Sequence, residues 1–100
     1  MTANGFAARD NGVFALSGRV TFQTVPQFMA RTDDWLQSGT KTVTIDMQGV
    51  TLADSAGVAL MLEWLQRARA AGRELVFTNL PEQVRQLIHV SGLQQVFRLR

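Results

Sequence analysis

The sequence predicts an α/β fold in which a small mixed β-sheet carries about three helices, packed mainly on one of its faces. Short segments with the alternating pattern of strands are separated by longer segments with helical periodicity. Helices that link strands imply crossover connections, which make at least part of the sheet parallel. The chain has 100 residues, of which 46% are hydrophobic and 18% charged. Residues 1–100 are therefore expected to form a single domain with a compact core.

The chain is expected to begin with a hairpin. Residues 6–9 indicate a short edge strand and residues 13–17 a second strand. Asn11 and Gly12 lie between them in an Asp-Asn-Gly turn signal, and both residue types tolerate positive φ. Gly18 follows, at the point where the second strand is expected to end or bend.

The first helix is predicted to begin at Thr24. Thr24 and Gln27 fit a capping box, in which the Thr24 hydroxyl accepts a hydrogen bond from the amide of Gln27. Pro26 lies in the first turn, where a missing N–H costs nothing. Gly39 is expected to end the helix in a left-handed conformation. The residues that recur at helical spacing are Val25, Phe28, Met29, Thr32, Trp35 and Leu36.

Residues 42–48 alternate and predict a strand with one buried face. The apolar side consists of Val43, Ile45 and Met47, and the polar side of Thr42, Thr44, Asp46 and Gln48. A loop at residues 49–53 is expected to lead into a second helix at residues 55–71. Gly72 is the natural stop of that helix.

The last third of the chain continues this order. Residues 74–78 indicate a strand, and the sequence Asn-Leu-Pro-Glu from Asn79 repeats the capping-box pattern before a third helix, which ends at Gly92. Residues 96–99 predict a last short strand. His89 lies off the inner face of the third helix and is expected to be solvated. That inner face consists of Val84, Leu87, Ile88 and Ser91.

Composition excludes several classes of function. The chain has no cysteine, which excludes disulfides, thiolate metal sites and thiol nucleophiles, and it has one histidine. The net charge is only +2, and the arginines are scattered without an aromatic stacking platform, so no nucleic-acid partner is expected. A Ser–His–Asp set can be drawn from Ser55, His89 and Asp46 or Asp54. The Gly-x-Ser-x-Gly elbow is absent, however, and no enzyme, metal or cofactor is expected.

The N-terminal residues lack the basic and apolar regions of an export signal. The longest apolar run, residues 58–62, is far shorter than the roughly 20 residues that span a bilayer. The expectation is therefore a cytoplasmic protein without direct membrane insertion. Any association with a membrane would come through a partner.

The candidate functional segment is the start of the second helix. Asp54 and Ser55 are both good N-caps, so their side chains lie beside unpaired backbone N–H groups. The positive potential there favours an anion, either a carboxylate or a phosphoryl group on Ser55. Ala56 and Gly57 keep the first turn small, so that another backbone or protein can approach closely. Ordinary helix capping is the alternative interpretation of the same residues.

Leu60 and Trp64 widen the apolar arc of this helix beyond what a one-sided helix needs. One interpretation packs both side chains under a neighbouring helix or the final segment. The other exposes them as a shoulder beside Ser55 that binds a protein partner, where Trp is a favoured anchor. The residue pattern leaves both interpretations open.

Three segments together resemble the STAS domain over roughly residues 13–97: VTIDMQGV, LADSAGVALMLEWLQRARAAGREL and LPEQVRQLIHVSGL. The most specific part is the Asp-Ser-Ala-Gly helix start that follows the Ile-Asp strand. The resemblance implies a single STAS domain over residues 1–100 that acts as a protein-interaction module and not as an enzyme. It also implies that Ser55 lies at the partner-facing end of its helix.

Anti-sigma-factor antagonists are one branch of this family. The resemblance implies that their motif serine, here Ser55, is phosphorylated by a kinase that is also the binding partner. Members of the branch commonly carry a Gly-Glu-Leu/Ile-Asp stretch after the second strand. Here the stretch is Gly-Arg-Val-Thr, with Thr21 in place of the acid. This difference disfavours the branch and leaves Ser55 chemically able to accept phosphate.

The favoured branch is similar to the small STAS subunit of the bacterial Mla phospholipid-transport system. The similarities are the minimal length, the missing acid and the very apolar second helix. This resemblance implies a subunit bound to the cytoplasmic ATPase of an ABC transporter, in a complex with permease and substrate-binding subunits, that maintains outer-membrane lipid asymmetry. It places Ser55 and the exposed shoulders of the second and third helices against the ATPase. The residues predicted to contact the partner are Asp54, Ser55, Ala56, Gly57, Leu60 and Trp64.

Overall fold

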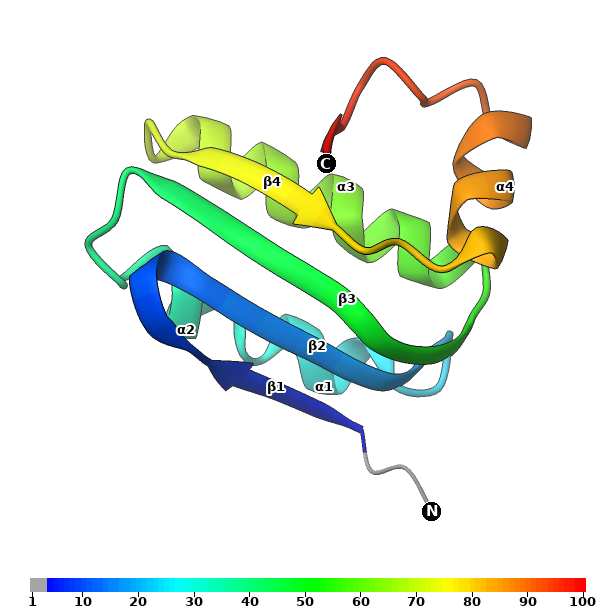
Figure 1. Ribbon diagram of the computed structural model, residues 1–100, viewed down its shortest axis with the longest axis horizontal. Helices are drawn as coiled ribbons and strands as arrows, with labels where there is room; N and C mark the ends of the chain where they lie inside the picture. Colours follow the sequence, from blue (N-terminus) through cyan, green and yellow to red (C-terminus); the bar gives the residue numbers. More distant parts are fainter. Residues whose placement is uncertain (1–3) are drawn as a thin grey trace.

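The computed structural model describes residues 4–100, which contain five strands, four α-helices and one short 3-10 helix (Figure 1). In chain order the elements are β1 (Gly5–Ala8), the 3-10 helix (Asp10–Gly12), β2 (Val13–Val20), α1 (Val25–Met29), α2 (Thr32–Leu36), β3 (Thr42–Ala53), α3 (Ser55–Ala70), β4 (Glu74–Thr78), α4 (Glu82–Val90) and β5 (Arg98–Leu99). The positions of β4 and α3 agree closely with the predicted strand and second helix.

The strands form one mixed sheet in the order β1-β2-β3-β4-β5. β1 and β2 are antiparallel, whereas β2–β3, β3–β4 and β4–β5 are parallel pairs. Asn11 and Gly12 have φ values of 61° and 75°, which the connection between β1 and β2 requires. The predicted hairpin and mixed sheet are therefore confirmed.

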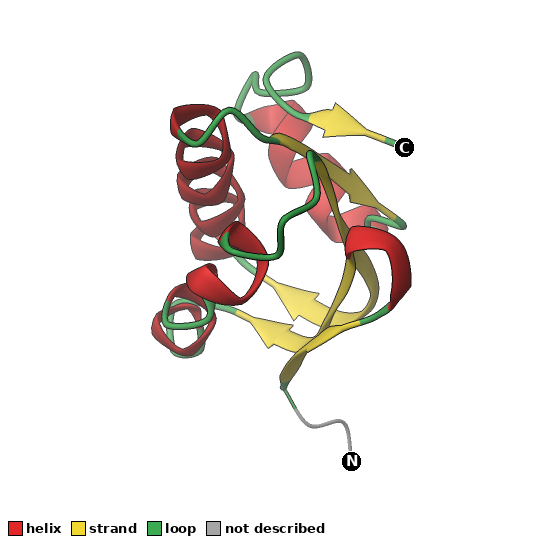
Figure 2. Ribbon diagram, turned by 90° about the vertical axis from the view of Figure 1, so that its left-hand side faces the viewer, coloured by secondary structure: helices red, strands yellow, loops and turns green. Residues whose placement is uncertain are grey.

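Helices α1, α2 and α3 cover one face of the sheet, and the other face is open (Figure 2). α4 lies at one end of the sheet and packs against α3 through the buried side chains of Val84 and Ile88. The predicted arrangement, with helices mainly on one face, is confirmed. It follows from the alternation of the strands, which supplies only one continuous apolar face.

The core lies between that face and the helices. Val43 and Ile45 of β3 are fully buried and stand beside Leu75 and Phe77 of β4 in the parallel register. Each such side chain contributes about 1.5–3 kcal/mol when it leaves water. This apolar layer fixes the position of α3 over the sheet, and α3 in turn carries the candidate functional residues at its first turn.

β3 is longer than the sequence predicts. Residues 49–53 continue the strand beside the second half of β2, which runs to Val20. The register shifts twice along this pair, and Gly18 bends the strand with a φ of 87° at the second shift. The predicted loop at 49–53 is therefore wrong, because a neighbouring strand supplies the backbone hydrogen bonds that this segment needs.

The first predicted helix is interrupted. At the break between α1 and α2, the Thr32 hydroxyl donates a hydrogen bond to the Met29 carbonyl at 2.7 Å, a bond that competes with helical pairing. The same oxygen accepts a hydrogen bond from the indole Nε1 of Trp64 at 2.9 Å. The two short helices bury Phe28 and Trp35. The prediction of one continuous helix is therefore wrong. The helical spacing of the apolar residues carries no information about the hydrogen bond between Thr32 and Trp64 of α3.

Neither predicted capping box forms. The Thr24 hydroxyl donates to the Arg19 carbonyl at 2.6 Å and accepts from the Thr21 amide at 3.0 Å, which closes the turn after β2. At the start of α4, Pro81 holds the N-cap position without a side-chain cap. The Asn79 side chain donates its hydrogen bond to β3. The turn before α1 thus takes the Thr24 hydroxyl, and a tertiary contact with Asp46 takes the Asn79 amide, so neither group is left to cap its helix.

Candidate functional site

Asp54 joins α3 to the loop that follows β2. Its Oδ1 accepts a hydrogen bond from the amide of Ala56 at 2.9 Å, and its Oδ2 accepts one from the amide of Phe22 at 3.0 Å. Its own amide donates to the Val20 carbonyl at 3.4 Å. The prediction that Asp54 caps the helix is confirmed, and the same carboxylate also holds the β2–α1 loop in place.

Ser55 is the first residue of α3, and its side chain is exposed. Its hydroxyl takes part in none of the side-chain hydrogen bonds found within residues 4–100. The first turn of a helix carries positive potential from its unpaired N–H groups. The hydroxyl is therefore accessible at a position that favours an acceptor or an anion.

Gly57 is buried, and its lack of a side chain serves the packing of this chain. A Cβ atom at Gly57 would lie 2.8 Å from the carbonyl oxygen of Val20 and 3.3 Å from its Cγ1 atom. The small first turn therefore admits the end of β2, so of the two approaches expected there, that of another backbone is the one the structure shows. Ala56 is half-buried beside it.

Leu60 and Trp64 belong to the core. Their side chains are 1% and 0% exposed, and the Trp64 ring packs at an angle against those of Phe6 and Trp35. The exposed-shoulder interpretation is therefore wrong for both residues. α1 and α2 cover the flank of α3 that the helical pattern left without a partner, and Thr32 satisfies the indole N–H.

Two exposed apolar side chains stand near Ser55 instead. Phe22 is 81% exposed in the loop tied to Asp54, and Leu52 is 39% exposed near the end of β3. Sequence reasoning missed both. For Phe22 the available signal was a single large aromatic residue in a polar turn, which a search for helical and strand periodicity does not detect.

The start of α4 borders the same end of the molecule. The Gln83 side-chain oxygen accepts a hydrogen bond from the amide of Ala53 at 3.0 Å, across the junction between β3 and α3. Three loops or helix ends therefore meet around Ser55: the β2–α1 loop, the β3–α3 junction and the first turn of α4. We call the surface formed by Phe22, Leu52, Ser55 and Gln83 the Ser55 end.

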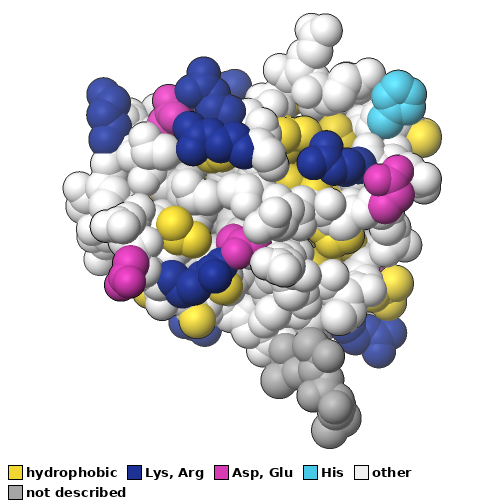
Figure 3. Space-filling view, viewed as in Figure 1, with side chains coloured by type: hydrophobic (Ala, Val, Ile, Leu, Met, Phe, Trp, Pro, Cys, Tyr) yellow, Lys and Arg dark blue, Asp and Glu magenta, His cyan; other side chains and the backbone are white. Residues whose placement is uncertain are grey.

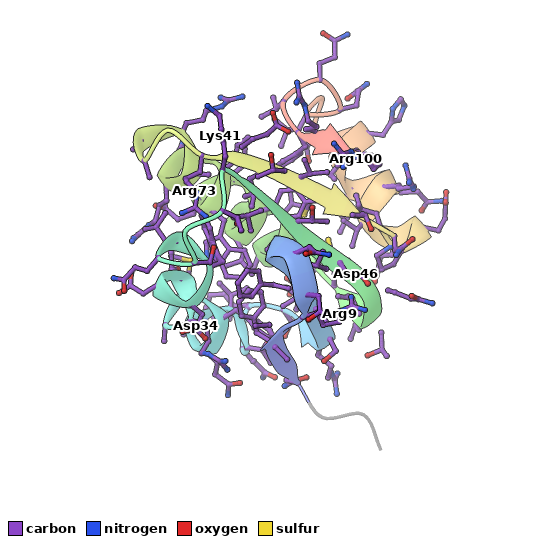
Figure 4. All side chains as sticks on the ribbon, turned by 60° about the vertical axis from the view of Figure 1, so that its left-hand side comes forward. Arg9, Asp34, Lys41, Asp46, Arg73 and Arg100 are labelled. Carbon is purple, nitrogen blue, oxygen red and sulfur yellow. The ribbon has the colours of Figure 1, made fainter. Side chains whose placement is uncertain are left out.

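Asp46 lies on the open face of the sheet, where Figure 3 shows hydrophobic side chains only in small, separate groups. Arg9 forms an ion pair with it, and both side chains point toward one another in Figure 4. Asn79 Nδ2 and the Gln48 amide donate to its Oδ1 at 3.0 and 2.9 Å. Burial raises the pKa of Asp46, but the hydrogen bonds from Asn79, Gln48 and Arg9 outweigh it and hold the pKa below its ordinary value of 3.8. These contacts account for Asp46 as a structural residue.

The Ser–His–Asp set drawn from the sequence is not assembled. His89 is exposed on α4, as predicted, and its Nδ1 lies 3.4 Å from the side-chain nitrogen of Gln94. No hydrogen bond links it to Ser55 within residues 4–100. In the same part of the chain, no group of three or more His, Asp or Glu residues is arranged to hold a metal ion. No helix there is both long and apolar enough to cross a membrane.

The chain belongs to the STAS domain family, because a model of that family matches residues 5–100. The matching model carries the description "Mlab, STAS domain". Among similar proteins is the anti-sigma-B factor antagonist of Staphylococcus aureus, which is 21% identical over 84 residues. That alignment covers 84% of this chain and 78% of the relative.

Solved structures of anti-sigma-factor antagonists share the fold. One from Mycobacterium paratuberculosis has a TM-score of 0.78 at 19% identity and covers 99% of this chain and 85% of that chain. The Bacillus cell fate determinant SpoIIAA in its phosphorylated form has a TM-score of 0.70 at 21% identity, with coverages of 98% and 91%. The predicted STAS fold is therefore confirmed.

Proposed function

We propose that this protein is a non-enzymatic STAS subunit that binds the cytoplasmic ATPase of an ABC transporter for phospholipids and stabilises or regulates it. In this role it would serve the maintenance of outer-membrane lipid asymmetry. The observation that carries the proposal is the Ser55 end, where an exposed serine and an exposed Phe22 stand on a loop and a helix that Asp54 already holds together. The description of the family model that matches residues 5–100 supports the transporter branch.

A surface of this kind suits a protein partner. The loop and the helix start are joined before binding, so little conformational entropy is lost on association. A protruding aromatic ring is a favoured anchor, and Leu52 extends the apolar contact beside it. If the surface binds one arrangement of the ATPase better than another, it shifts the ATPase toward that arrangement by the difference in affinity.

A second candidate function is that of an anti-sigma-factor antagonist switched by phosphorylation of Ser55. The observations in its favour are the named relatives and the exposed Ser55 hydroxyl at a helix N-terminus, where a phosphoryl group is stabilised. Thr21 stands where members of that branch commonly carry an acid. Incubation with ATP and a cognate kinase, followed by mass spectrometry, tests this candidate. A mass increase of one phosphate on Ser55 is its expected result.

The proposed function is tested by co-expression with the ABC ATPase and permease encoded nearest to this protein in its genome. The wild-type chain is expected to co-purify with them. Ser55→Asp and Phe22→Ser are each expected to weaken that association at least tenfold, because one adds charge to a close contact and the other removes an anchor.

Gln37→Asp is the matched control, because it adds the same charge at the exposed C-cap of α2, next to Leu36, which lies beside the last turn of α3 and thus at the other end of that helix from Ser55. It is expected to bind as the wild type does. Equal binding by all three variants would exclude the Ser55 end as the contact surface. Failure of the wild-type chain to co-purify, together with phosphate on Ser55, would favour the antagonist function instead.

A further inference from the structure

The end of the molecule opposite the Ser55 end contains a cleft. It has a volume of about 410 Å³ and lies between the last turns of α3, the start of β4 and the segment that leads into β5. Arg69 lines it from the last turn of α3, about 21 Å along the helix axis from Ser55 at 1.5 Å per residue. The cleft is therefore a separate place on the surface from the proposed ATPase contact.

Positive charge dominates the cleft. Arg69, Arg73 and Arg98 line it together with one acid, Glu74. The Arg98 guanidinium is paired with the Glu74 carboxylate at 2.7 Å. Arg69 is exposed and forms none of the ion pairs found within residues 4–100. Figure 3 shows Lys and Arg side chains gathered over this part of the molecule, beside the start of β4.

Arg73 carries an unused donor. Its Nη1 donates to the Leu36 carbonyl at the end of α2, and its Nη2 donates to the Ser38 hydroxyl just after it at 2.9 Å. Its Nε is buried and has no hydrogen-bond partner among residues 4–100. A buried unpaired donor carries a desolvation cost, which the hydrogen bonds from Nη1 and Nη2 offset. Arg73 is therefore engaged by the end of α2, and Arg69 is the arginine of the cleft that has no ion-pair partner among residues 4–100.

The floor of the cleft is apolar, and one strand edge beside it is open. Leu65, Leu75 and Phe97 line it as buried side chains. Within the described part of the chain, β5 pairs with β4 only at Val76 and Phe77, so the first residues of β4 have no strand on that side. An extended segment is the chemical form that can use an unpaired strand edge and an apolar floor together.

We propose that this cleft binds a short acidic peptide segment of a partner protein. A carboxylate of the segment pairs with Arg69, and the extended backbone of the segment lies along the open edge at the start of β4. A single inorganic anion fills little of a cleft this size. A lipid chain needs a mostly apolar lining, which the three arginines do not supply.

The test uses the full chain and a fluorescein-labelled peptide, Gly-Asp-Leu-Glu-Leu-Gly, with fluorescence anisotropy at low ionic strength. The acidic peptide is expected to bind, and its affinity is expected to fall as sodium chloride is raised. The uncharged peptide Gly-Asn-Leu-Gln-Leu-Gly is expected to bind at least tenfold more weakly. Arg69→Gln is expected to weaken the acidic peptide roughly tenfold, the effect of one charge-assisted contact.

Arg67→Gln is the matched control, because Arg67 lies two residues away on a different face of α3, outside the cleft, and pairs with Glu63 at 3.1 Å. It removes the same charge and is expected to change the affinity less than twofold. If both variants weakened peptide binding equally, net charge alone would explain the attraction, and the proposal would be overturned. Equal binding of the uncharged peptide would overturn it as well. So would Arg69-dependent capture of phosphatidylglycerol vesicles, or Arg69-dependent binding of inorganic phosphate, without peptide binding.

Discussion

Replacing the two buried tryptophans by phenylalanine, one at a time, is expected to destabilise the protein unequally. Both rings are fully buried, and their centroids lie 5.8 Å apart at an angle of 67°. The indole N–H of Trp64 donates to the Thr32 hydroxyl at 2.9 Å, whereas that of Trp35 is buried without a partner among residues 4–100. The two substitutions remove the same atoms and differ in the hydrogen bond.

The expected difference can be worked from these contacts. Trp64→Phe loses a net hydrogen-bond contribution of about 0.5–1.5 kcal/mol in addition to its cavity cost. Trp35→Phe has a similar cavity cost but removes an unpaired buried donor, which itself costs about 1–3 kcal/mol. Trp64→Phe is therefore expected to be less stable than Trp35→Phe by roughly 2 kcal/mol.

Urea unfolding followed by far-ultraviolet circular dichroism measures the difference without relying on tryptophan emission. With a slope of roughly 1–3 kcal/mol per molar urea, the two midpoints are expected to differ by about 1 M. Thr32→Val in the Trp64→Phe background checks the assignment, because the two changes should be less than additive. Equal midpoints, or a lower midpoint for Trp35→Phe, would refute the assigned hydrogen bond.

Three further substitutions test the residues around α3 and on the open face of the sheet. Gly57→Ala is expected to cost about 1–2 kcal/mol in urea unfolding, because overpacking against the Val20 carbonyl exceeds the gain in helix propensity; a more stable variant would contradict the close approach. Asp54→Ala is expected to cost about 1–2 kcal/mol and to increase hydrogen exchange at the Phe22 amide, and unchanged exchange there would show that the carboxylate does not hold the loop. Because its folded-state pKa is lowered, Asp46 contributes stability that is present above its ordinary pKa of 3.8 and is lost as pH falls through the lower folded value. The stability difference between the wild type and Asp46→Asn is thus expected to shrink as unfolding is measured from neutral pH into that acidic range, and a difference that grows on acidification would contradict the sign.

Most of the fold could be predicted from local pattern. The alternation of residues 42–48 and the helical periodicity from Ser55 onward define the central strand and α3. These segments are predictable because each one carries its own apolar face, which requires no knowledge of its neighbours. The capping role of Asp54 belongs to the same class, since the side chain bonds an amide only two residues away.

The composition of the Ser55 end was only partly predictable. Ser55 and Asp54 were found because they start a helix, whereas the helical pattern left open whether Leu60 and Trp64 are core or surface, and only the family resemblance placed them among the contact residues. Whether an apolar flank is covered depends on α1 and α2, which the pattern of α3 does not contain. Phe22 was missed for the opposite reason, because a lone aromatic residue in a turn has no periodic signal.

By itself the sequence determined the order of the elements, the apolar face of each strand and helix, and the small, capped start of α3. Only the tertiary structure decided which polar and apolar groups remain free. The Asn79 amide and the Trp64 ring bond partners more than 30 residues away, and the Thr24 hydroxyl bonds the turn before its helix, so none of the three is available for the role that local pattern suggested. The physical reason is that a side chain's surroundings are set by every element packed against it, whereas its secondary structure is set largely by its neighbours in sequence.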